Sequence, residues 1–367
     1  MKNPSLSPGI HRHYPALDGL RGIAILLVVF YHNFGFSNYF LFGWLGVDLF
    51  FVLSGFLITS ILMNEVGSKN YLKNFYGRRV LRIFPLYYLL LFICLVILPV
   101  FPTFKDNLHY YTSNQLWLWA YLQNWLYVFK IPEDTNVLLH LWSLAVEEQY
   151  YLIWPFVILL IRKPKPLLAL SLLLLIGIVI FRLILWQRHI EGFHYFGLYT
   201  FTRFDGICIG SALALLRIIS PKLISLYTAP IILTIAGLNF IFYFANKNSN
   251  FTFPYFAFVG YTTFAIMFAV LVNEAATLNK NVITRILNIP FLRFFGKISY
   301  GFYIFHWPIY RFLSPILLNY LTKEFTIDTF YSQIIASSIT TLIGLAISVA
   351  SLYLFEMKFL KLKKYFS

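Results

Sequence analysis

The sequence predicts an all-α integral membrane protein with about ten transmembrane helices and with both termini in the cytoplasm. The first observation is composition: 59% of the 367 residues are hydrophobic and only 12% are charged, whereas soluble domains carry about 25% charged residues. The second is the recurrence of apolar runs close to the ~20 residues that a helix needs to cross a bilayer. The third is that lysine and arginine gather in alternate loops between these runs, as they do on the cytoplasmic side of membrane proteins.

Ten apolar runs are long enough to span, and they follow one another without an internal repeat or a low-complexity linker. Residues 1–367 are therefore expected to form one membrane-embedded domain with no appended soluble domain. The polar N-terminus lacks the small-residue cleavage site of a signal peptide, so the first span is expected to stay. The runs lie near residues 20–36, 40–63, 83–101, 138–161, 167–186, 196–216, 223–244, 254–272, 294–318 and 331–355.

An eleventh segment, residues 115–129, is short and rich in tryptophan and tyrosine. If it crossed the membrane, every later loop would invert and the basic loops would face outward, against the positive-inside rule. We therefore expect an interfacial or re-entrant aromatic segment on the outer face. The basic residues that this arrangement places in the cytoplasm include Lys69, Lys73, Arg78, Arg162, Lys163, Arg217, Arg285, Arg293, Lys358 and Lys364.

The net charge of +15 does not indicate a nucleic-acid partner, because the basic residues lie in short loops at the ends of spans. The chain is instead expected to contact membrane lipid over much of its surface. The two cysteines, Cys94 and Cys208, lie inside apolar runs and far from any metal-ligand spacing. Neither a disulfide framework nor a metal site is expected.

Ionisable side chains inside spans are costly in lipid and usually mark function. His32 lies eleven residues beyond Arg21, which is a rise of ~16.5 Å and about 20° past three full turns. The two side chains therefore share a helix face, with Arg21 at the cytoplasmic surface and His32 near mid-membrane. The full set of intramembrane candidates is His32, Asp48, His140, Glu147, Glu148, Arg182, Arg203, Asp205 and His306.

A histidine and a carboxylate that meet at mid-membrane can handle a proton, with the carboxylate fixing the imidazole tautomer. Glu147 reaches mid-membrane from the outer end of its span, so it could supply that carboxylate to His32. Glu147 and Glu148 point ~100° apart on a helix, so they cannot both face one partner.

The alternative for several of these charges is that they only hold helices together. Arg182, Arg203 and Asp205 could pair with one another, and the neighbouring Gly206 and Gly210 form a small-residue face suited to close packing. His306, in the sequence HWP, stays open between a functional and a structural role.

The segment FYGRRVLRIFP places Arg79 and Arg82 three residues apart at the cytoplasmic start of the third span, and so on one helix face. A guanidinium pair at that place can hold a phosphate through two-pronged hydrogen bonds. The alternative is ordinary positive-inside anchoring, for which lysine would serve equally well.

Taken together, the chain resembles the acyltransferase family 3 proteins, which are bacterial integral-membrane O-acyltransferases that modify cell-envelope glycans. The stretches that carry the resemblance cover nearly the whole chain in order: YPALDGLRGIAILLVVFYHN, GWLGVDLFFVLSGFLI, FYGRRVLRIFPLYY, LHLWSLAVEEQYYLIWP and GKISYGFYIFHWPI. The resemblance implies that Arg21 and His32 form the Arg-x10-His signature of the family, in which the histidine is catalytic. It also implies that Arg79 and Arg82 form the Arg-x-x-Arg motif associated with the acyl donor.

The same resemblance assigns roles to three acidic residues. Glu147 matches the carboxylate of the family's SLxxE segment, and Glu148 matches its more variable second acid. Asp18, in LDGLR, would organise the cytoplasmic mouth of the site. Asp48 and His306 are kept as further supporting candidates. Some relatives carry an extracytoplasmic hydrolase-like domain, which is not expected here because the sequence ends shortly after the tenth run.

The function that this resemblance implies is transfer of an acyl group, most often acetyl, from cytoplasmic acyl-CoA across the bacterial inner membrane. The acceptor would be a hydroxyl of an extracytoplasmic or lipid-linked carbohydrate such as O-antigen or exopolysaccharide. Arg21, Arg79 and Arg82 would hold the phosphates of the donor, and no metal would take part. His32 would act as a base oriented by Glu147, or would itself carry the acyl group. The alternative is a transporter or flippase for a lipid-linked sugar, which would also use charges at mid-membrane.

Overall fold

The computed structural model describes residues 14–131, 136–190, 193–221, 228–245, 260–277 and 281–366, and every regular element in these residues is a helix. The expected all-α class is therefore confirmed for this part of the chain. The α-helices are α1 Pro15–Phe34, α2 Leu45–Glu65, α3 Tyr71–Phe92, α4 Pro102–Ser113, α5 Gln115–Trp119, α6 Gln123–Phe129, α7 Trp142–Ile161, α8 Pro164–Gln187, α9 Phe193–Gly197, α10 Thr200–Arg203, α11 Asp205–Ile219, α12 Thr228–Ala245, α13 Tyr261–Ala275, α14 Val282–Leu287, α15 Pro290–Glu324, α16 Thr329–Ser351 and α17 Met357–Leu360.

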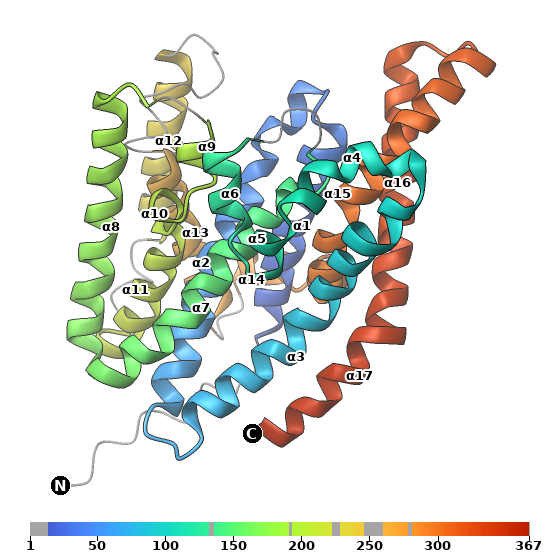
Figure 1. The fold of residues 1–367 in the computed structure, drawn as a ribbon. Coiled ribbons are helices and arrows are strands. Elements are labelled where there is room, and N and C mark those ends of the chain that lie inside the picture. The colour runs from blue at the N-terminus through green and yellow to red at the C-terminus, as the bar shows by residue number, and fades with distance from the viewer. Residues whose placement is uncertain are drawn as a thin grey trace, which may run out of the picture.

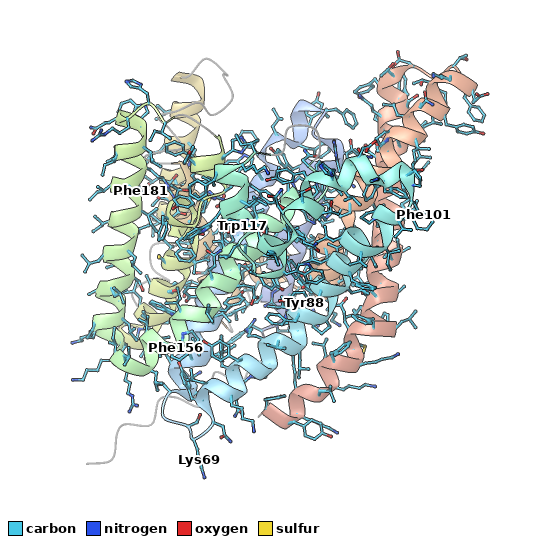
Figure 2. All side chains as sticks on the ribbon, in the orientation of Figure 1. Lys69, Tyr88, Phe101, Trp117, Phe156 and Phe181 are labelled. Atoms are coloured by element: carbon cyan, nitrogen blue, oxygen red, sulfur yellow. The ribbon has the colours of Figure 1, made fainter. Side chains whose placement is uncertain are left out.

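The helices form one bundle (Figure 1), in which α8, α11, α12 and α13 lie on one side and α15 and α16 on the other. Helices α1, α2 and α7 run through the middle, and α3 crosses the front obliquely. Lys69, between α2 and α3, lies at the lower edge, whereas Phe101, beyond α3, lies near the upper right (Figure 2). Helix α3 therefore runs from one face of the bundle to the other.

Six helical stretches among the described residues are long and apolar enough to cross a membrane. They agree with six of the ten predicted runs. The predicted run 294–318 forms part of the 35-residue α15, which falls outside these six. The total of about ten spans and the side of each terminus stay predictions. The six stretches are Pro15–Phe34, Tyr39–Glu65, Tyr71–Val100, Leu139–Ile161, Pro164–Gln187 and Thr329–Phe366.

The predicted continuous run 196–216 is wrong, because the structure divides it into α9, α10 and the 15-residue α11. Between α9 and α10 the backbone is extended at Tyr199, with φ −76° and ψ 135°. The backbone carbonyl of Thr202 in α10 accepts a hydrogen bond from Arg182 Nε of α8 at 2.7 Å. The predicted runs 223–244 and 254–272 begin outside the described residues and continue as α12 and α13.

The aromatic segment 115–129 forms two short helices, α5 and α6, of five and seven residues. At 1.5 Å per residue neither can cross a bilayer. The turn between them contains Tyr121, whose φ of 54° lies in the left-handed region. Asn124 of α6 is fully buried and donates to Thr200 Oγ1 at 2.8 Å. The segment is thus fixed onto the bundle by buried polar contacts, and its position on the outer face stays a prediction.

Helices α1 and α15 approach each other so closely that their contact requires glycine. A Cβ atom at Gly22 would lie 2.0 Å from the Leu292 carbonyl oxygen, and one at Gly296 would lie 1.9 Å from the Asp18 carbonyl oxygen. Small residues at such contacts let helix backbones pack closely in a membrane. This contact brings together two residues further along the two helices: His32, ten residues beyond Gly22, and His306, ten residues beyond Gly296.

A second close contact joins α2 and α11. A Cβ atom at Gly210 would lie 2.1 Å from the Val52 carbonyl oxygen, and one at Gly55 would lie 2.1 Å from the Ile207 carbonyl oxygen. The predicted small-residue face at 206–210 is therefore confirmed as a packing surface.

Candidate active site

Five helices surround a cavity of about 720 Å³, including its open mouth. The three arginines that the sequence predicts to bind the donor, Arg21, Arg79 and Arg82, all line it. They come from two helices, α1 and α3, so their meeting is a tertiary feature. The remaining lining residues are Val47, Phe50, Phe51, Ser54, Ile83, Ser143, Leu144, Glu147, Tyr151, Ser299, Tyr300 and Tyr303.

The cavity arginines form few direct ion pairs. Arg21 forms an ion pair with Asp18 at 3.3 Å, which places Asp18 next to one cavity-lining arginine. Among the described residues, neither Arg79 nor Arg82 has an ion-pair partner within 4 Å. The Arg79 guanidinium instead lies 5.3 Å from the centre of the Tyr151 ring. Two guanidinium groups with no carboxylate oxygen of the described residues within 4 Å make this a site suited to an anionic ligand.

Two residues of the C-terminal segment lie near the same arginines and were not predicted. Lys363 lies within electrostatic range of Arg21, Arg79 and Arg82, and Glu356 interacts with Arg82. The segment is tied to the start of α3, because Arg78 donates to the Phe366 carbonyl at 2.8 Å. Only the tertiary fold brings this segment to the cavity, so no local pattern could have indicated it.

Glu147 is fixed inside the cavity by two hydroxyl groups. Ser54 donates to its Oε1 at 2.7 Å, and Tyr151 donates to its Oε2 at 3.1 Å. The expected pairing of Glu147 with His32 is therefore not what the structure shows. The hydroxyl groups of Ser54 and Tyr151 also lie 3.0 Å apart. The carboxylate thus belongs to the cavity wall, together with the three arginines.

Glu148 points elsewhere, as the ~100° step along a helix requires. It is not among the residues that line the cavity. Its electrostatic interactions are with Glu147 and Arg79, and with Tyr87, Tyr121 and Tyr300. Glu147 thus lines the cavity and Glu148 does not, although both interact electrostatically with Arg79.

The hydrogen-bond partner of His32 is His306. His32 Nδ1 and His306 Nε2 lie 2.8 Å apart, and the two ring planes are nearly parallel, at 7°, with ring centres 5.1 Å apart. Trp307 packs against His32, with the two ring centres 4.6 Å apart. His306 is completely buried. The structure thus brings together two residues that lie 274 positions apart in the sequence.

A third histidine, His140, completes this cluster, although the sequence analysis gave it no role in the site. Its ring centre lies 5.6 Å from that of His306, and its Nε2 lies 3.4 Å from the Ile304 carbonyl oxygen. Pro308 explains why that oxygen is free, because proline has no N–H for the carbonyl four residues earlier. Within the described part of the chain, no hydrogen-bond partner is found for the buried His140 Nδ1.

Tyr303 and Ser143 separate the arginine cavity from the histidine cluster. Both line the cavity. The Tyr303 hydroxyl donates to the His140 carbonyl, so Ser143 Oγ donates to the Tyr303 oxygen at 2.6 Å. The Tyr303 ring lies 5.8 Å from the His306 ring and 5.5 Å from the His140 ring, centre to centre. The histidines therefore lie directly behind the inner wall of the cavity.

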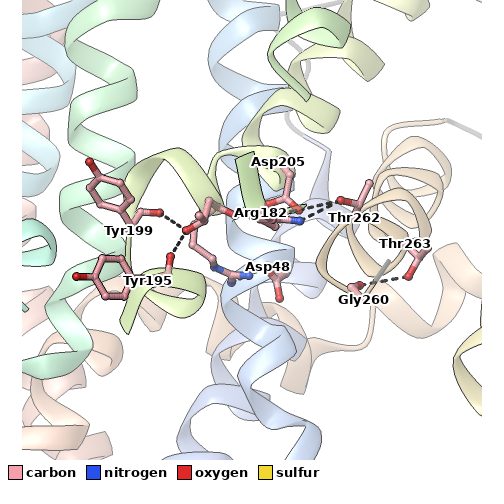
Figure 3. Close-up of polar contacts among 10 residues, drawn as sticks. Asp48, Arg182, Tyr195, Tyr199, Asp205, Gly260, Thr262 and Thr263 are labelled. Atoms are coloured by element: carbon pink, nitrogen blue, oxygen red, sulfur yellow. Dashed lines mark hydrogen bonds and ion pairs between the residues drawn. The ribbon is translucent and has the colours of Figure 1, made fainter. Parts of the chain in front are cut away.

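The remaining intramembrane charges form two buried ion pairs away from this wall (Figure 3). Arg182 pairs with Asp205 at 2.6 Å, which confirms one pairing that the sequence suggested. Arg203 pairs with Asp48 at 2.6 Å, so Asp48 belongs to this cluster. Thr262 donates to Asp205 at 3.2 Å. These contacts join α2, α8, α10, α11 and α13, which favours the structural interpretation of these charges.

Among the described residues, no group of three or more His, Cys, Asp or Glu side chains is arranged to hold a metal ion. The site therefore consists of a cationic cavity, a hydroxyl-bearing wall and a histidine cluster. Such an arrangement can bind an anionic donor and exchange a proton beside it.

Comparison of the sequence with known proteins places this chain in a family. A family model described as an acyltransferase domain matches residues 14–355. YrhL of Bacillus subtilis is 34% identical over 328 residues, covering 83% of this chain and 50% of that protein. The peptidoglycan O-acetyltransferase OatA of Listeria monocytogenes is 32% identical over 332 residues, covering 83% of this chain and 51% of that protein.

The O-acetyltransferase OatA of Staphylococcus aureus is 30% identical over 322 residues, with coverage of 83% and 51%. The chain thus spans about half the length of these curated relatives. No solved structure matches it. The family match covers almost the whole bundle, including the arginine cavity and the three histidines, and the chain therefore belongs to acyltransferase family 3.

Proposed function

We propose that this chain transfers an acetyl group from acetyl-CoA to a hydroxyl group of cell-wall carbohydrate at the bacterial inner membrane. The observation that carries the proposal is the position of the His32–His306 pair directly behind a cavity lined by Arg21, Arg79 and Arg82. The arginines offer a site for the phosphates of the donor, and the histidines offer a proton acceptor within reach of its thioester. The family assignment gives the transporter alternative no support.

Peptidoglycan is the proposed acceptor, in place of the O-antigen or exopolysaccharide expected from the sequence. The support is that the Listeria relative is named a peptidoglycan O-acetyltransferase. The acceptor would approach the histidines from the side opposite the arginines, where Trp307 contacts His32. An aromatic ring there offers a sugar a flat apolar surface.

His32 can act in two ways, and both use a ring nitrogen without a proton. As a general base it takes the proton of the acceptor hydroxyl while that oxygen attacks the thioester carbonyl. As a nucleophile it takes the acetyl group first and passes it to the hydroxyl. To separate the two routes, the protein is incubated with labelled acetyl-CoA in the absence of acceptor and then quenched. Only the nucleophilic route leaves a labelled acetyl group on the protein.

The test of the function is acetyl transfer from radiolabelled acetyl-CoA to peptidoglycan fragments by the full chain, purified in detergent. His32→Ala should lower the rate by on the order of 100- to 10,000-fold, as loss of a catalytic base typically does. His109→Ala, which changes an exposed histidine on α4, serves as the control and should retain the rate. Near-normal transfer by a folded His32→Ala protein would refute the proposed mechanism.

A further inference from the structure

The surroundings of His306 determine which of its nitrogens carries the proton. Its Nδ1 lies 2.9 Å from the Phe302 carbonyl oxygen and 2.8 Å from the Tyr303 carbonyl oxygen. A carbonyl oxygen only accepts hydrogen bonds, so this nitrogen must donate and must carry the hydrogen. In the neutral ring the other nitrogen, Nε2, then has a free lone pair.

That lone pair in turn fixes the state of His32. His306 Nε2 lies 2.8 Å from His32 Nδ1, and a hydrogen bond between two nitrogens needs one hydrogen. Since His306 Nε2 has none, His32 Nδ1 must supply it. His32 Nε2 is therefore left unprotonated and available to the substrates.

From this chain of hydrogen bonds we propose that His306 is a positioning residue, which holds His32 in the tautomer whose Nε2 is the reactive nitrogen. The inference rests on the proposed function only in assigning a use to that nitrogen. In a serine hydrolase triad a buried carboxylate fixes the tautomer of the catalytic histidine. Here a neutral imidazole, itself fixed by two backbone carbonyls, does the same.

A neutral partner suits this place in the molecule. An unpaired carboxylate beside His32 would be a full charge in a buried site, which is costly in a membrane protein. His306 is completely buried and lies on α15 within the close contact with α1. Its imidazole orients His32 without bringing a charge into the resting site.

The proton balance of the transfer follows from the same geometry. The acceptor hydroxyl gives its proton to His32 Nε2 as its oxygen forms a bond to the thioester carbonyl carbon. The carbon–sulfur bond then breaks, and the leaving thiolate takes the proton from His32 Nε2. The products are the ester and the free thiol, and both histidines return to their starting tautomers. While His32 is protonated, its Nδ1–H remains bonded to His306 Nε2, which stabilises the imidazolium.

The test is nitrogen NMR of the full chain labelled with ¹⁵N-histidine, because protonated and unprotonated ring nitrogens have well-separated shifts. The His32→Gln protein identifies the signals of residue 32 by their loss. In the unmodified protein both His32 and His306 should carry hydrogen on Nδ1. A His32 signal with hydrogen on Nε2 would overturn the proposal, and this measurement does not depend on any substitution of His306.

Two variants of residue 306 extend the test. In His306→Ala, His32 should shift toward the Nε2–H tautomer that free imidazole favours, and kcat should fall on the order of 100-fold while the KM for acetyl-CoA stays within about twofold. His306→Gln should keep Nδ1–H on His32 and retain more activity, since the amide oxygen can accept at the position of the lost Nε2. An unchanged His32 tautomer in His306→Ala would overturn the proposal.

The same data separate this inference from the proposed function. The expected tautomers together with normal transfer by His32→Gln would support the positioning role of His306 and refute the use of His32 as base or nucleophile. The opposite result has two parts: the His32→Gln protein is inactive, and His32 of the unmodified protein carries its hydrogen on Nε2. That result would support the use of His32 in transfer and refute the positioning role of His306.

Discussion

Three neighbouring arginines on α3 have different surroundings, and this difference separates ligand binding from anchoring. Arg78 forms an ion pair with Glu65 and donates a hydrogen bond to the Phe366 carbonyl oxygen. Arg79 and Arg82 line the cavity and have no ion-pair partner among the described residues. Positive charge near the membrane surface orients a protein whether lysine or arginine supplies it. Two-pronged contact with a phosphate, however, needs the planar guanidinium group.

Replacing the cavity arginines with lysine should therefore weaken donor binding without disturbing membrane insertion. Charge-assisted hydrogen bonds contribute ~1.5–3 kcal/mol, so Arg79→Lys and Arg82→Lys should each raise the Kd for acetyl-CoA by roughly 10- to 150-fold. Calorimetry on purified protein measures the effect, and dephospho-CoA shows which phosphate is held. Arg78→Lys is the matched control and should leave the Kd within about twofold. Equal Kd values for all three variants would mean that Arg79 and Arg82 are anchors.

At the level of elements, the contact between α1 and α15 positions the reactive pair. His32 and His306 meet because their helices touch at Gly22 and Gly296, where backbone atoms of one helix occupy the space of a side chain on the other. A backbone carbonyl cannot rotate away as a side chain can. A methyl group at either glycine must therefore move a whole helix.

The substitution Gly22→Ala should lower both stability and transfer rate. Overpacking of this kind typically costs about 1–3 kcal/mol, and the shift of α1 should separate His32 from His306. Gly177→Ala on α8 is the control, because a Cβ there meets no atom within 4 Å; it should be neutral or slightly stabilising. Thermal unfolding in detergent and acetyl transfer measure the two effects. A Gly22→Ala protein as stable and as active as Gly177→Ala would contradict this account of the contact.

The sequence predicted those parts of the site that depend on local helix geometry. Arg79 and Arg82 share a face because they are three residues apart, and Glu147 and Glu148 diverge because they are adjacent. The bond from Tyr151 to Glu147 spans four residues and could have been predicted in the same way. The His32–His306 bond could not, because it depends on a contact between distant helices that leaves only scattered glycines in the sequence. The division of the predicted run 196–216 at the extended Tyr199 was missed, although Gly197 lies two residues before it.

For the molecule as a whole, the predicted orientation can be tested at two exposed lysines. Lys69 lies between α2 and α3, and Lys130 follows α6. A cysteine at position 69 should react with a membrane-impermeant maleimide only after the cells are opened, and one at position 130 should react in intact cells. The native Cys94 and Cys208 are both buried, so they should contribute little background. Labelling of position 69 in intact cells would overturn the predicted orientation.

The wall formed by Tyr303 and Ser143 also bears on how tightly the protein seals its membrane. Moving one elementary charge across a membrane changes its energy by about 2.3 kcal/mol per 100 mV of membrane potential. A continuous file of water from the arginine cavity past three histidines would therefore be a route for proton leakage. The Tyr303 hydroxyl donates its hydrogen to the His140 carbonyl oxygen, and the Ser143 hydroxyl donates its hydrogen to the Tyr303 oxygen. Because both hydroxyl hydrogens are directed at protein oxygens, neither is available to a file of water, and we expect the wall to slow proton leakage from a cavity that is open to solvent.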